Sequence, residues 1–110
     1  MTILIILFIL LMMDKTYSVA EIRSKVTLTA RQYGIQKAYL FGSYARGEAG
    51  KESDIDICIE KGKLRTLFEL SGFCRDLEDT LEKKVDVVTT TSLSGDFKKQ
   101  IEKEMILLYE

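Results

Sequence analysis

A glycine-serine pair and two closely spaced aspartates constrain this chain more than any other feature. Gly42 and Ser43 end a short β-prone run, and Asp54 and Asp56 open a second run in which polar and apolar residues alternate. Such alternation is the period of a half-buried strand, so both aspartates leave the same face of it. The sequence therefore predicts a glycine-containing loop, followed along the chain by a strand that presents two carboxylates.

These residue types suit a nucleoside triphosphate with its divalent metal ions. Mg²⁺ takes oxygen ligands, and two such ions can clamp the attacking and leaving oxygens of a transferred phosphoryl group. Backbone N–H groups at Gly42 and Ser43, where a short helix is expected to begin, would meet the phosphates, and Arg46 follows one turn later. Each piece alone is common, because D-x-D pairs are usually solvated surface. The conjunction at this spacing is far more specific.

The complete absence of histidine excludes several chemistries. Ser-His-Asp and Cys-His catalysis and His-ligated zinc all require an imidazole. The 16 basic and 17 acidic residues give a net charge of -1, so no basic surplus supports binding to long nucleic acid. Cys58 and Cys74 lack metal-type spacing and are expected to be reduced thiols.

The hydrophobic periodicity predicts one α/β domain, for which 110 residues suffice. A helix is expected over 18–33, opened by a capping box of Ser18 and Glu21 and ended by Gly34. Strands are expected at 38–41, 54–60, 84–89 and 105–109. Apolar stripes predict two further helices, one carrying Leu64, Leu67, Phe68, Cys74, Leu77 and Leu81, the other carrying Phe97 and Ile101.

The run Ile3–Met13 is entirely apolar. It is shorter than the roughly 17–25 residues of a membrane-spanning helix, and it lacks the flanks of a secretory signal. The favoured interpretation is that translation starts at Met12 or Met13, so that residues 1–13 are an apolar leader and 14–110 form the domain. The second interpretation is an apolar extension that packs on the domain or on a partner, and the third is a membrane anchor.

The segment 41–57 closely resembles the signature of the DNA polymerase β-like nucleotidyltransferase superfamily. Within it, the segment is most similar to the minimal nucleotidyltransferases, the antitoxins of modules whose toxin is a HEPN-domain RNase. The resemblance covers roughly residues 15–110 and implies a small mixed β-sheet flanked by helices. It also implies a third carboxylate on a later strand, which Asp86 supplies. Cys58, where such strands usually carry an aliphatic residue, is expected to pack rather than to react.

The resemblance implies a cytoplasmic, Mg²⁺-dependent enzyme that transfers AMP from ATP to a tyrosine of a HEPN toxin. It assigns catalytic and metal-binding roles to Asp54, Asp56 and Asp86, and nucleotide-binding roles to Gly42, Ser43 and Arg46. Because the chain leaves no residues for an acceptor domain, we expect a hetero-complex with a protein acceptor, without long nucleic acid or membrane. Two alternatives stay open: a non-catalytic toxin-binding antitoxin, and nucleotidyl transfer to a small molecule such as an aminoglycoside.

Overall fold

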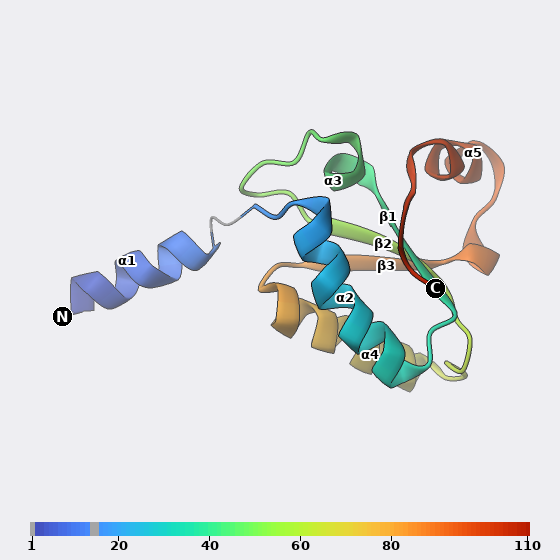
Figure 1. Ribbon diagram of the computed structural model, residues 1–110, viewed down its shortest axis with the longest axis horizontal. Coiled ribbons are helices and arrows are strands. Elements are labelled where there is room, and N and C mark those ends of the chain that lie inside the picture. The colour runs from blue at the N-terminus through green and yellow to red at the C-terminus, as the bar shows by residue number, and fades with distance from the viewer. Residues whose placement is uncertain (1, 14–15) are drawn as a thin grey trace.

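The computed structural model describes residues 2–13 and 16–110, which form helices around one four-stranded sheet (Figure 1). The helices are α1 (Thr2–Met13), α2 (Val19–Tyr33), α3 (Gly42–Arg46), α4 (Leu67–Leu81) and α5 (Gly95–Glu104). The strands are β1 (Lys37–Phe41), β2 (Ile55–Glu60), β3 (Val85–Thr89) and β4 (Ile106–Tyr109), and a 3-10 turn spans Thr90–Ser92. From α2 onward the expected order of helices and strands is confirmed, and α1 precedes it.

The sheet is mixed, with the strand order β3-β2-β1-β4. β1 pairs antiparallel with both β2 and β4, whereas β2 and β3 run parallel. A parallel pair needs a crossover connection, and α4 provides it between β2 and β3. The prediction of a small mixed sheet flanked by helices is confirmed, and the strand that carries Asp86 lies directly beside the strand that carries Asp56.

The two faces of the sheet have different partners. Ile55, Ile57 and Ile59 of β2 are fully buried in the larger core, which α2 and α4 complete. Figure 1 shows these two helices next to each other on one side of the sheet. On the opposite face Cys58 packs with Phe41 and with Ile101 of α5 in a second cluster. Cys58 therefore has the packing role expected of it, and the aspartates share its face.

α2 begins and ends where its sequence predicts. The Ser18 side chain accepts a hydrogen bond from the Glu21 backbone N–H at 3.1 Å, and the Glu21 carboxylate accepts one from the Ser18 N–H at 3.2 Å. Gly34 ends the helix with a left-handed φ of 68°. This reciprocal cap satisfies two backbone donors that a helix end otherwise leaves unpaired.

The predicted apolar stripe of α4 is wrong in its first turn. Leu67 and Phe68 are 82% and 89% exposed, and Leu64 is buried in the loop before the helix. Thr66 caps the helix, so Leu64 precedes it, and the buried side chains of α4 begin only at Phe73. Phe73, which the predicted stripe passed over, is fully buried and meets Tyr33 edge-on.

The apolar N-terminal run forms α1, which extends away from the sheet in Figure 1. The side chains of Ile3 to Leu7 are 50–72% exposed. None of the helices in the described ranges has the length and apolar character that crossing a membrane requires. The boundary predicted at residue 14 lies outside the described residues, and a start at Met12 or Met13 stays a prediction.

Candidate active site

The pairing of β2 with β3 brings two of the three predicted aspartates together. Asp56 lies opposite Asp86 in the parallel register. Adjacent strands are about 4.8 Å apart, and register partners project from the same face. Asp54, immediately before β2, shares the face of Asp56 because side chains alternate along an extended chain. The local sequence does not identify the strand that pairs with β2. The strand order of the sheet shows that this strand is β3.

Gly42 lies against the carboxylate of Asp56. Phe41 is opposite Asp56 in the antiparallel β1–β2 pairing, so the chain turns into α3 beside that carboxylate. Gly42 has a φ of 74°, and a Cβ built on it would overlap Asp56 Oδ2. Any side chain at this position would collide with the carboxylate. The predicted loop and the predicted carboxylate therefore meet, and the contact requires glycine.

Burial and neighbouring negative charge both raise the pKa of Asp56. Its pKa is raised from 3.8 to about 6, chiefly because burial penalises the ionised form, and next because Asp86 and Asp54 repel it. Arg46 acts in the opposite direction, and Glu104 adds a further small increase. A half-buried carboxyl raised by its neighbours is typical of a functional site.

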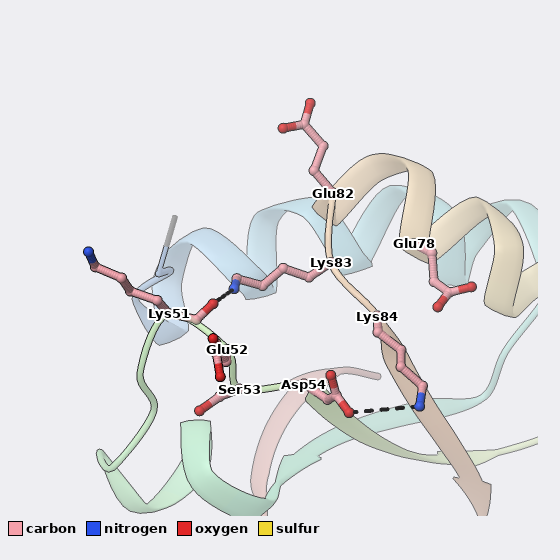
Figure 2. A pocket seen from close by; sticks show the side chains of 8 residues that line it. All are labelled: Lys51, Glu52, Ser53, Asp54, Glu78, Glu82, Lys83 and Lys84. Atoms are coloured by element: carbon pink, nitrogen blue, oxygen red, sulfur yellow. Dashed lines mark hydrogen bonds and ion pairs between the residues drawn. The ribbon is translucent and has the colours of Figure 1, made fainter. Parts of the chain in front are cut away.

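Asp54 borders a hollow of about 450 Å³ between the loop before β2 and the end of α4. Figure 2 shows Asp54 and Lys84 pointing toward one another, with Lys84 Nζ 4.0 Å from Asp54 Oδ2. Lys83 Nζ closes the loop by donating to the Lys51 carbonyl at 2.8 Å. Three lysines and four acidic residues line the hollow, so it has no single sign of charge.

Arg46 is held by two carboxylates. Its Nη1 is 3.0 Å from Glu104 Oε2, and its Nε is 3.0 Å from Glu48 Oε2. Glu104 Oε1 also accepts a hydrogen bond from the Gly42 backbone N–H at 3.0 Å. Ser43 follows Gly42 in α3, and its carbonyl accepts from the Glu48 N–H, which closes this short helix.

Sequence reasoning missed Glu104 and Lys84 as neighbours of the site. Glu104 is far along the chain from Gly42, at the end of a helix whose docking no local pattern encodes. Lys84 is two residues from Asp86, and strand alternation places it on the same face. That alternation was the one available signal, and it becomes informative only once β3 is paired with β2.

The donor set suits a hard divalent cation. Asp56 and Asp86 supply carboxylate oxygens from adjacent strands. The two carboxylates repel each other, and a bound cation would relieve this repulsion. Within residues 2–13 and 16–110, however, no three carboxylate or thiol side chains are gathered closely enough to hold a metal ion among themselves. Mg²⁺ sites commonly take one or two carboxylates and complete their shell with substrate phosphates and water.

Comparison with known protein families gives a match over most of the chain. Residues 24–110 match the model of the family described as Polymerase beta, Nucleotidyltransferase. This range contains both strands of the aspartates, the Gly42-Ser43 turn and Glu104.

The match to two individual relatives extends over nearly the whole length of each relative. A candidate protein adenylyltransferase of Methanocaldococcus jannaschii is 37% identical over 89 residues, which are 81% of this chain and 96% of the relative. The protein adenylyltransferase MntA of Thermococcus cleftensis is 31% identical over 90 residues, covering 78% and 91%. Among solved structures, a crystal structure of a toxin-antitoxin with AMP-PNP superposes with a TM-score of 0.68 at 27% identity, over 78% of this chain and 71% of that one.

Proposed function

Because this chain belongs to the Polymerase beta, Nucleotidyltransferase family, we propose that it transfers AMP from ATP to a tyrosine hydroxyl of a partner toxin. The partner would be a HEPN-domain protein, and the chain its antitoxin. The relatives named protein adenylyltransferases and the toxin-antitoxin structure with AMP-PNP support this choice of donor and acceptor.

One observation carries the proposal: the Gly42 turn lies in contact with the carboxylate of Asp56, which is itself paired in register with Asp86. A turn whose backbone N–H can meet a phosphate oxygen is useful only beside the groups that neutralise the phosphates. Conversely, a carboxylate pair without such a turn is ordinary surface. Their contact unites the two halves of a metal-triphosphate site.

We assign the residues as follows. Asp54, Asp56 and Asp86 would hold up to two Mg²⁺ ions together with the triphosphate, and Gly42, Ser43 and Arg46 would hold the phosphates. When bound, the metal ions supply charge neutralisation for the transferred and leaving groups. Asp56 must be ionised to act as a ligand, and its pKa of about 6 allows this at neutral pH.

The reaction joins the acceptor oxygen to the α-phosphorus of ATP. The bond between that phosphorus and the oxygen bridging to the β-phosphate breaks, so pyrophosphate leaves and AMP stays on the acceptor. The acceptor proton passes to Asp86 or to water. Asp86 is exposed, as a group that receives a proton from an incoming partner must be.

The test is an intact-mass measurement on the partner. The chain is co-expressed with the product of the adjacent gene, and the purified pair is incubated with ATP and Mg²⁺. We expect the partner to gain the mass of one or more AMP units. The gain should disappear when Asp54 and Asp56 are both replaced by asparagine, because both are proposed metal ligands.

A matched variant controls for the loss of charge. Asp79→Asn with Asp96→Asn removes the same two charges at exposed positions on α4 and α5, and it should leave the AMP gain unchanged. A partner that is bound and inhibited yet keeps its unmodified mass would refute the enzyme and favour a binding antitoxin. A small-molecule acceptor would instead leave the partner unmodified and unbound.

A further inference from the structure

A carboxylate of the chain occupies two of the donors that the proposed function assigns to nucleotide phosphates. Glu104 accepts from the Gly42 N–H through Oε1 and from Arg46 Nη1 through Oε2, each at 3.0 Å. The Glu104 side chain is only 13% exposed. A backbone N–H and a guanidinium converging on one anion form the arrangement that proteins use to hold phosphate oxygens.

We propose that Glu104 is a built-in anion that fills part of the phosphate subsite of the free protein, and that the triphosphate displaces it on binding. This inference rests on the proposed function, since it takes Gly42 and Arg46 as phosphate-binding groups. The proposal adds Glu104 of α5 to the three aspartates and the Gly-Ser turn. It also adds a competition between this carboxylate and the triphosphate for the same donors.

The stereochemistry makes the two occupants exclude each other. Gly42 has a single backbone N–H, and Glu104 Oε1 already accepts its hydrogen. A phosphate oxygen that takes this hydrogen must therefore replace Oε1. The alternative, in which both anions stay, brings two negative groups together beside Asp56, whose pKa the charge of Glu104 already raises.

The surroundings let Glu104 leave without disrupting the fold. Glu104 is the last residue of α5, and the chain becomes extended at Met105. Its flexible side chain can take another rotamer while Ile101 keeps the helix docked in the second cluster. Arg46 retains Glu48 as a partner after Glu104 departs, so the guanidinium stays near the turn.

The test compares binding of inorganic tripolyphosphate and of ATP with Mg²⁺ to the full chain and its Glu104→Gln variant, by isothermal calorimetry. Glutamine keeps the shape but removes the competing charge. We expect both ligands to bind the variant about three- to tenfold more tightly, the equivalent of one net hydrogen bond. If Glu104 instead supports the turn for the nucleotide, the variant will bind equally or more weakly, which overturns the proposal.

Two further variants keep the result interpretable. Glu102→Gln makes the same change of charge at an exposed position on the same helix, and it should alter the dissociation constants less than twofold. Glu104→Asp keeps the charge but is too short to bridge both donors, so it should also bind more tightly than the unmodified chain. Circular dichroism establishes that each variant is folded.

Displacement itself is read from the ¹³C resonance of the Glu104 carboxylate, assigned through the Glu104→Gln variant. The resonance should shift as tripolyphosphate saturates the protein; an unmoved resonance in the saturated protein overturns the proposal. If the resonance shifts but no AMP transfer occurs, the proposed function fails and the displacement stands. If AMP transfer occurs and Glu104→Gln binds no more tightly, the displacement alone fails.

Discussion

At the scale of single residues, Asp56 is where folding and function oppose each other. It is half-buried, lies over the Cα of Gly42, and is repelled by Asp86 and Asp54. Its raised pKa means that the folded state holds the proton of this group more tightly than the unfolded chain does. The ionised form that metal binding needs is therefore the form that destabilises the free protein.

This opposition predicts a stabilising Asp56→Asn variant. The folded-state pKa is about 6 against 3.8 for an unperturbed group, so stability is lost as the pH rises from about 4 to about 6 and stays lost above it. Allowing for solvent screening, neutral asparagine should raise the free energy of unfolding by about 1–2 kcal/mol at pH 8. The gain should vanish near pH 4, where aspartate is protonated. Urea denaturation of both proteins at the two pH values measures the difference.

Asp79→Asn is the comparison, because Asp79 is exposed on α4 and should show no such pH-dependent gain. A destabilised Asp56→Asn at pH 8 would show that the Asp56 carboxylate is a structural acceptor rather than a strained ligand. Stabilisation accompanied by loss of AMP transfer is the pattern expected of a group retained for function at the expense of stability.

At the scale of elements, α4 shows what hydrophobic periodicity can and cannot predict. Periodicity identifies the residues that share a helix face, but another element must cover that face. The later turns of α4 pack in the core through Phe73, Leu77 and Leu81, whereas Leu67 and Phe68 of the first turn are not part of that core. Leu67 and Phe68 are consequently exposed despite their apolar character.

Two phenylalanines of α4 give a matched pair of substitutions. Phe73→Ala removes a fully buried ring that contacts Tyr33 with the ring centroids 5.5 Å apart, and it should cost about 3–5 kcal/mol. Phe68→Ala removes a ring that is 89% exposed and should change the free energy of unfolding by less than about 0.5 kcal/mol. Chemical denaturation measures both. Similar costs for the two variants would contradict the packing described for this helix.

At the scale of the whole molecule, the sequence predicted what is local and missed what the sheet brings together. The capping box of α2, the alternation of β2 and the Gly42 turn are each encoded within a few residues, and the structure has them. The pairing of Asp56 with Asp86 was expected from a family resemblance, because strand order is not a local property. The contact of Glu104 with Gly42 depends on how α5 docks, for which the chain carries no short-range signal.

At the same scale, the proposed function gives a partner protein a physical role. The proposed metal-triphosphate site lies on the described strands and helices, and the hollow beside Asp54 opens to the surface next to it. Binding energy for an acceptor must come from contacts outside the reacting groups. In the proposed function, a partner protein that presents its own tyrosine to this site would provide them.

The central claim is that these carboxylates transfer the α-phosphoryl group of ATP, with its nucleoside, to a protein. The most direct measurement incubates the chain and its partner with Mg²⁺ and ATP labelled with ³²P at either the α- or the γ-phosphorus. The partner should become labelled only from α-labelled ATP, and the label should disappear with the Asp54→Asn, Asp56→Asn double variant. Labelling from γ-labelled ATP, or no label from either, would contradict the claim.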